Sequence, residues 1–301
     1  MDAAVETSVP LDPRDRLAES EWRKESAEFW MSAKTDQRTT YDLYLEKTPT
    51  APRVRFEEVA DGRIRGWWAR PEAAATEDGI LYLHGGSYTL GSAKAYRNFV
   101  SQIAARTNVA AFILDYPRAP EAALPVALGL VGEARDWLST RGVHELALVG
   151  DSAGGGLALA ALAARGFHDG VIPVVACVAL SPWTDLTLPG AARTYPDPVL
   201  PIDGMLASSA AYLGGKDPTD PRASPVFAVP EGLPPLLIQV GTDERLLDDS
   251  KRYAAAARAR GNLVRLEIWE GMHHVFQAQT DVLESSNTAL DRVARFLREQ
   301  F

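Results

Sequence analysis

Residues 145–162 read Glu-Leu-Ala-Leu-Val-Gly-Asp-Ser-Ala-Gly-Gly-Gly-Leu-Ala-Leu-Ala-Ala-Leu, and this stretch decides the fold. The apolar run 146–149 is typical of a buried strand, and the Ala- and Leu-rich run that follows favours a helix. Between them, Gly150, Ser152 and Gly154 match G-x-S-x-G, in which small residues permit a sharp strand-to-helix turn. The unpaired N–H groups of the helix's first turn would suit an oxyanion. Taken alone, the motif leaves Ser152 as either a nucleophile or a helix cap.

The rest of the chain alternates strands with helices, which predicts an α/β fold with a mostly parallel central sheet flanked by helices. A hairpin is expected first, with strands near 54–59 and 64–68 joined at Asp61-Gly62. Five further apolar runs besides 146–149 predict strands at 80–83, 109–114, 174–180, 236–240 and 264–269. Helical patterns fall near 93–105, 122–140, 203–212, 246–260 and 282–299. Residues 1–53 are polar and predict one or two helices without a strand.

Changes in composition along the 301 residues divide the chain into an N-terminal segment, a core and an inserted segment, within a length suited to a single domain. We expect an α/β core over 54–185 and 226–301. The proline-rich but partly apolar segment 186–225 predicts a helical cap or lid inserted into that core. The N-terminal segment 1–53 is expected to contribute to the same cap.

Charge and cysteine content exclude several classes of protein. With 31 Lys and Arg against 40 Asp and Glu, the net charge of −9 argues against a nucleic-acid partner. The single cysteine, Cys177, lies in an apolar run and is expected to be a buried small hydrophobe. A basic, apolar leader is not evident at the N-terminus, and no apolar run of about 18 residues follows. The sequence therefore predicts a cytoplasmic protein without stable membrane insertion, and a homodimer is compatible with it.

Polar residues follow several predicted strands, where the carboxyl ends of parallel strands meet at one edge of the sheet. These are the loop at His84, Ser152, Asp243 and His274, and their chain order of serine, acid and histidine is that of a hydrolytic triad. Asp248 and Asp249 compete with Asp243 as the acid, but they fall in an expected helix N-terminus, where acids are ordinary. The adjacent histidines have no third ligand at zinc spacing, so no metal site is expected.

The chain resembles the hormone-sensitive-lipase family of carboxylesterases, within the α/β-hydrolase fold. The resemblance covers about residues 54–300 and is carried by several spaced motifs. They are His84-Gly85-Gly86-Ser87-Tyr88, Asp115-Tyr116 with Ala119-Pro120-Glu121, Gly150-Asp151-Ser152-Ala153-Gly154-Gly155, Ser181-Pro182-Trp183 with Asp185, Gly241-Thr242-Asp243 with Leu247-Asp248-Asp249, and Gly271-Met272 with His274-Val275-Phe276. Family spacing after Gly271-Met272 favours His274 over His273, which we expect to face solvent or to support the site indirectly.

The resemblance implies a serine carboxylesterase that acts on short- to medium-chain esters through an acyl-enzyme, with no cofactor. Ser152 would be the nucleophile, His274 the general base and Asp243 the acid that orients it. The oxyanion hole would take N–H groups of Gly86, Ser87 and Ala153, with Gly85 shaping the loop. Ser87 departs from the family, which usually has a third glycine there.

Other roles and functions stay open at this point. His84 is expected to fix the oxyanion loop rather than to act as an acid or base. Tyr88, Met205 and Phe276 are candidates to line the substrate pocket, with core packing as the alternative. A lactone hydrolase, an amidase or a transacylase would use the same triad. A non-catalytic small-molecule receptor is the alternative from another class, although the gibberellin receptors that resemble this family lack the catalytic histidine.

Overall fold

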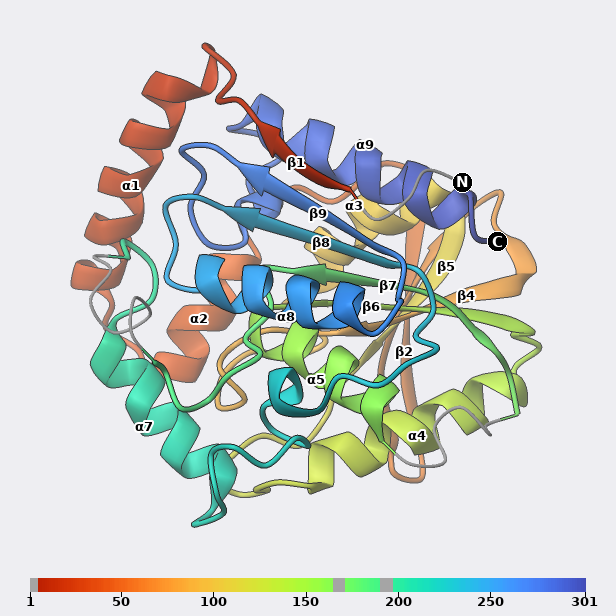
Figure 1. The fold of residues 1–301 in the computed structure, drawn as a ribbon. Helices are drawn as coiled ribbons and strands as arrows, with labels where there is room; N and C mark the ends of the chain where they lie inside the picture. The colour runs from red at the N-terminus through yellow and green to blue at the C-terminus, as the bar shows by residue number, and fades with distance from the viewer. Residues whose placement is uncertain (1–4, 165–170, 190–196) are drawn as a thin grey trace.

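A computed structural model describes residues 5–164, 171–189 and 197–301 and has one nine-stranded sheet (Figure 1). The strand order is β1-β9-β8-β7-β6-β4-β5-β3-β2. The strands are β1 (Glu6–Val9), β2 (Val54–Asp61), β3 (Ile64–Pro71), β4 (Ala75–Leu83), β5 (Val109–Leu114), β6 (Glu145–Asp151), β7 (Val174–Leu180), β8 (Leu236–Gly241) and β9 (Val264–Trp269). The α-helices are α1 (Asp15–Ser32), α2 (Gln37–Leu45), α3 (Arg97–Thr107), α4 (Val126–Ser139), α5 (Ser152–Ala163), α7 (Ile202–Leu213), α8 (Leu247–Ala259) and α9 (Glu284–Arg298).

The sheet is parallel except at one edge, as predicted. β2 and β3 form the expected antiparallel hairpin, and β3 continues antiparallel to β5. The prediction of an N-terminal segment without a strand was wrong, because β1 pairs in parallel with β9. Its sequence, Glu-Thr-Ser-Val, has no apolar run, so the strand depends on backbone pairing with an edge that β9 offers rather than on a local pattern.

Helices cover both faces of the sheet, and the side chains of each strand alternate between two cores. Along β4, Leu81 and Leu83 enter one core, whereas Ile80 and Tyr82 enter the other. The first core includes side chains of α4, α5 and α8, and the second includes those of α3 and α9. Burial on both faces explains why the strands read as continuous apolar runs. Cys177, in β7, is fully buried, as expected.

Both expected cap segments contain helices. The N-terminal segment forms α1 and α2, and the 186–225 segment contains α7. Residues 190–196 of that segment, and His168, lie outside the described residues. α4 begins at Val126 rather than near 122, directly after Pro125.

The turn between β6 and α5 leaves no space for a side chain at its glycines. A Cβ placed on Gly154 would lie 2.0 Å from the carbonyl oxygen of Leu83 in the neighbouring strand β4. A Cβ on Gly150 would lie 2.5 Å from the carbonyl oxygen of Gly154. These backbone contacts hold the start of α5 against the end of β4.

We therefore predict that Gly154→Ala lowers the free energy of unfolding by about 1–3 kcal/mol or more, because the added methyl meets backbone atoms. Gly129→Ala is the matched control, since Gly129 is exposed in α4 and a Cβ there meets nothing within 4 Å. That change is expected to stabilise the protein by up to about 1 kcal/mol. Urea unfolding of both variants checks this, and equal effects would contradict the close packing described here.

Candidate active site

Ser152 lies at the junction of β6 and α5 and has a backbone conformation that residues other than glycine seldom adopt. Its φ is +52°, in the left-handed region, and the residue is nearly buried. Such a conformation persists only where the surroundings hold it, and here the close contacts of Gly150 and Gly154 do so. The first N–H groups of α5, including that of Ala153, have no acceptor within their own helix. The serine is therefore placed beside free backbone donors.

His274 follows β9, and its acidic partner is Glu244 rather than the expected Asp243. The Nδ1 atom of His274 lies 2.5 Å from Oε2 of Glu244. The side chain of Glu244 is fully buried and that of His274 is 5% exposed. The other carboxylate oxygen, Oε1, accepts hydrogen bonds from the Ser181 hydroxyl and the Gly241 N–H, both at 2.7 Å. These donors lie at or just after the ends of β7, β8 and β9.

Asp243 points away from His274 and binds the N-terminal helix instead. Its Oδ2 accepts from Nη2 of Arg23 at 2.9 Å, and its side chain is 34% exposed. The expected pairing of Asp243 with His274 is therefore corrected: the carboxylate that contacts His274 is that of Glu244. Two consecutive acids follow β8, and consecutive side chains point in different directions, so chain order alone does not choose between them. Glu244 satisfies the same order of serine, acid and histidine, so the order in the sequence is compatible with either acid.

The surroundings of His274 favour its protonated form. Burial opposes a charge on the ring, but the charge and the hydrogen bond of Glu244 outweigh it and raise the pKa of His274 above 6.5. Asp197 and Asp151 act in the same direction. Asp151 directly precedes Ser152, so the carboxylate next to the serine contributes to this rise in the pKa of His274.

The loop after β4 turns back on itself and leaves backbone N–H groups free. The carbonyl of Gly86 accepts from the N–H groups of Thr89 and Leu90, at 3.0 and 2.8 Å. Gly86, Ser87 and Tyr88 all have positive φ, +104°, +53° and +63°. Ser87 therefore adopts the conformation that the usual glycine would favour. Within the described residues, the N–H groups of Gly86 and Ser87 have no hydrogen-bond acceptor.

Asp151 holds this loop in place from underneath. Its buried carboxylate accepts from the N–H of Gly85 at 2.9 Å, and from the hydroxyls of Tyr82 and Tyr96 at 2.7 and 2.9 Å. Burial raises the pKa of Asp151 to about 6, although these donors oppose that rise. A Cβ on Gly85 would lie 2.2 Å from Oδ2 of Asp151. Gly85 thus shapes the loop, and its own N–H donates to Asp151.

His84 is a buried, neutral part of the same loop. Its Nδ1 lies 2.8 Å from the Gly85 carbonyl oxygen and donates to it, and its ring stacks on Tyr116 at 4.2 Å. Burial lowers the pKa of His84 to about 4, so the ring carries no charge at neutral pH. These contacts agree with a role in fixing the loop.

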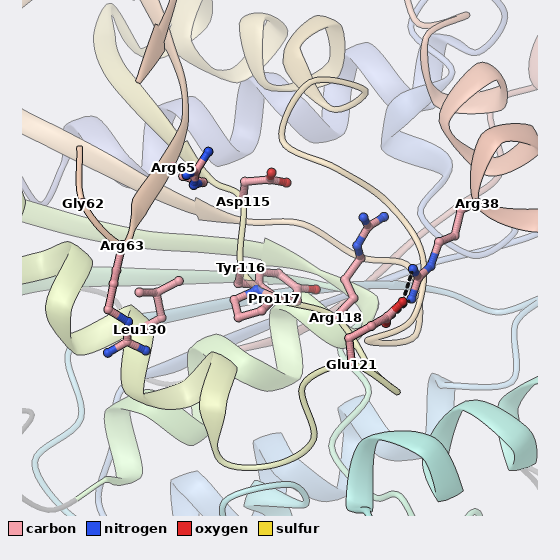
Figure 2. Close-up of a pocket in the computed structure, with 10 residues that line it drawn as sticks. All are labelled: Arg38, Gly62, Arg63, Arg65, Asp115, Tyr116, Pro117, Arg118, Glu121 and Leu130. Carbon is pink, nitrogen blue, oxygen red and sulfur yellow. Dashed lines mark hydrogen bonds and ion pairs between the residues drawn. The ribbon is translucent and has the colours of Figure 1, made fainter. Parts of the chain in front are cut away.

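A cavity of about 580 Å³ is lined by Arg38 of α2, the β2–β3 hairpin and the segment that follows β5, and its lining contains none of Ser152, Glu244 and His274 (Figure 2). In it, Arg38 of α2 forms a double hydrogen bond with Glu121, at 2.7 Å to each oxygen. The hydrogen bonds from Arg38 lower the pKa of Glu121 to about 2. Arg38 also donates to the carbonyl oxygens of Thr89 and Ala119, both at 2.8 Å. Arg38 thus connects α2 both to the loop after β4 and to the segment after β5.

The structure does not bring the three expected pocket residues together. Tyr88 and Met205 are buried in the core that includes α5 and α7, and Tyr88 stacks on Tyr212 of α7 at 3.8 Å. Phe276 lies in a separate cluster and packs against Trp269 with ring centroids 5.3 Å apart. Phe276 is therefore packed apart from Tyr88 and Met205, and a pocket role for the three residues stays a prediction. His273 is also buried, so the option that it faces solvent was wrong.

No helix among the described residues has the length and apolar character needed to cross a bilayer.

Comparison with known proteins defines the class to which this fold and site belong. The model of a family described as having the alpha/beta hydrolase fold matches residues 80–278. An acetyl-hydrolase of Streptomyces hygroscopicus is 36% identical over 299 residues, which cover 97% of each chain.

Solved structures narrow the class further. An esterase of the bacterial hormone-sensitive lipase family is 36% identical, with a TM-score of 0.87 and coverage of 96% of this chain and 98% of that one. The esterase EstE5, in a crystal soaked with p-nitrophenyl butyrate, is 36% identical, with a TM-score of 0.84 and coverage of 94% and 98%. The chain belongs to the hormone-sensitive-lipase family of carboxylesterases.

The contacts of the two consecutive acids predict opposite results on substitution. Glu244→Gln is expected to lower kcat for ester hydrolysis by about 10³–10⁴-fold, because an amide opposite Nδ1 selects the wrong histidine tautomer. Asp243→Asn, which affects the contacts with Arg23 and with the Thr242 hydroxyl but none with His274, is expected to lower kcat less than about tenfold. Steady-state kinetics on p-nitrophenyl butyrate checks both. A severe loss in Asp243→Asn with near-normal Glu244→Gln would restore Asp243 as the acid.

Proposed function

We propose that this carboxylesterase hydrolyses short- to medium-chain esters through an acyl-enzyme on Ser152, with His274 as the base and Glu244 as the acid. The observation that carries the proposal is the buried Glu244–His274 pair, at 2.5 Å, on the same edge of the sheet as the strained serine turn. An elbow serine without an oriented base would be a poor nucleophile, and this pair supplies the orientation.

In the proposed reaction, His274 takes the proton of the Ser152 hydroxyl as the serine oxygen attacks the ester carbonyl carbon. Glu244 holds Nδ1–H, which leaves Nε2 free to accept, and it stabilises the imidazolium that forms. The N–H groups of Gly86, Ser87 and Ala153 stabilise the oxyanion. His274 then returns the proton to the leaving alcohol. Water, deprotonated by the same ring, attacks the acyl-enzyme and releases the acid and the free serine.

The two helical segments that border the site would form its cap and limit the length of the acyl chain. Helix α7 touches the oxyanion loop twice, through the Tyr88–Tyr212 stack and through the Thr89 and Ser208 hydroxyls at 3.1 Å. Helix α2 binds the same loop through Arg38. The acetyl-hydrolase name of one relative and the butyrate ester soaked into crystals of another agree with a small acyl group. The receptor alternative is disfavoured because the histidine and its buried carboxylate are both retained.

Ser152→Ala tests the proposal most simply. Removing the nucleophile is expected to lower hydrolysis of p-nitrophenyl butyrate by about 10⁴-fold or more, because only binding and the oxyanion hole would remain. Circular dichroism should report an unchanged fold. Turnover near the wild-type rate would rule out Ser152 as the nucleophile. A series from acetate to dodecanoate esters would then place the chain-length limit, and a preference for dodecanoate would contradict the proposed range.

The pH dependence follows from the raised pKa of His274. The base works only when neutral, so kcat/KM should fall as pH drops through that pKa, with a midpoint above 6.5. Glu244→Gln removes the charge that raises the pKa, and its residual activity should fall off at a lower pH. A pH–rate profile corrected for spontaneous ester hydrolysis checks both midpoints. A wild-type maximum near pH 4 would contradict the assignment of His274.

A further inference from the structure

The N-terminal helix α1 stands across the carboxyl ends of β8 and β9, next to the loops that carry the acid and the base (Figure 1). Its residue Glu19 is buried, and its carboxylate is hydrogen-bonded to the ring of His273, the residue just before His274. Nδ1 of His273 lies 2.9 and 2.8 Å from the two oxygens of the Glu19 carboxylate. The loop that carries the base is thus tied to a helix more than 250 residues away in the chain.

A second residue of α1 contacts the face of the His273 ring. Trp22, one helical turn from Glu19, stacks on His273 with ring centroids 3.5 Å apart and planes tilted by only 13°. The side chain of His273 is 1% exposed. Since one ring edge is hydrogen-bonded and one face is stacked, the ring has little freedom to rotate. The backbone that it shares with His274 is constrained accordingly.

Arg23 extends the same contact to the loop of the acid. Its Nη2 donates to Glu19 at 2.8 Å, to Asp243 at 2.9 Å and to the carbonyl oxygen of Gly271 at 3.1 Å. Asp243 directly precedes Glu244, and its own N–H donates to the Met272 carbonyl at 3.0 Å. Helix α1 therefore contacts Asp243 and His273, the residues that immediately precede Glu244 and His274.

We propose that Glu19 and Trp22 are positioning residues, which act through His273 to hold His274 in register with Glu244 and Ser152. The role rests on the proposed function, because it is defined by the base it positions. The Glu19–His273 contact is not explained by fold stability alone. A buried carboxylate with a polar partner adds little stability over an apolar side chain of similar size, because removing the carboxylate from water is costly. Geometry is the more demanding requirement, because a misplacement of about 1 Å costs about 10²-fold in rate.

The test compares Glu19→Ala, Glu19→Gln and the control Glu21→Ala, whose side chain is exposed on the same helix. Glu19→Ala is expected to lower kcat for p-nitrophenyl butyrate by about 10- to 100-fold with KM changed less than about twofold. Glu19→Gln still accepts from the ring N–H and should recover kcat to within about fivefold of wild type. Glu21→Ala should match the wild type. All are assayed at least 10 °C below their melting temperatures.

Trp22→Leu is the second variant, for the case that Glu19→Ala does not fold at the assay temperature. It removes the stack and leaves the carboxylate, and it is expected to lower kcat by about fivefold or more at constant KM. A folded Glu19→Ala or Trp22→Leu with the kcat of Glu21→Ala, or a change confined to KM, would overturn the positioning role. Ser152→Ala, assayed alongside, separates the two proposals: turnover there would overturn the proposed function itself.

Discussion

The Glu244 carboxylate accepts hydrogen bonds from three successive strand ends, and the site depends on that convergence. Ser181 follows β7, Gly241 ends β8 and His274 follows β9, and all three donate to the one buried carboxylate. A buried carboxylate is costly unless its oxygens are satisfied, so these donors stabilise it while they set its direction. The remaining direction points at the imidazole. The carboxylate that contacts His274 is therefore held in place by the carboxyl edge of the sheet.

A second buried carboxylate does the same for the other half of the site. Asp151 ends β6, directly before the serine, and it holds the oxyanion loop through Gly85 and the core through Tyr82 and Tyr96. Serine turn and loop are thereby joined by one side chain. Segments far apart in the chain then brace this arrangement from outside, with α1 at the Glu244–His274 pair and α2 and α7 at the loop.

The sequence predicted the sheet well because most of its strands are buried on both faces. Residues 109–114, 174–180 and 264–269 are strands with those bounds. β1 was missed because its residues carry no pattern and its strand is created by pairing with β9. Glu244 was missed for a related reason. Two acids follow β8, and the turn geometry set by Gly241, where a Cβ would lie 2.0 Å from the Met272 carbonyl oxygen, decides which one faces the histidine. Such close backbone contacts arise only in the folded chain.

Covalent labelling of the serine tests whether the Glu244–His274 pair activates Ser152, without reference to any particular ester. The protein would be treated with a serine-directed sulfonyl fluoride and the modified peptide located by mass spectrometry. We expect one adduct per chain, on Ser152, and expect it to form at least about 10²-fold more slowly in Glu244→Gln than in the wild type. Modification of another residue, or labelling of Glu244→Gln at the wild-type rate, would contradict this expectation.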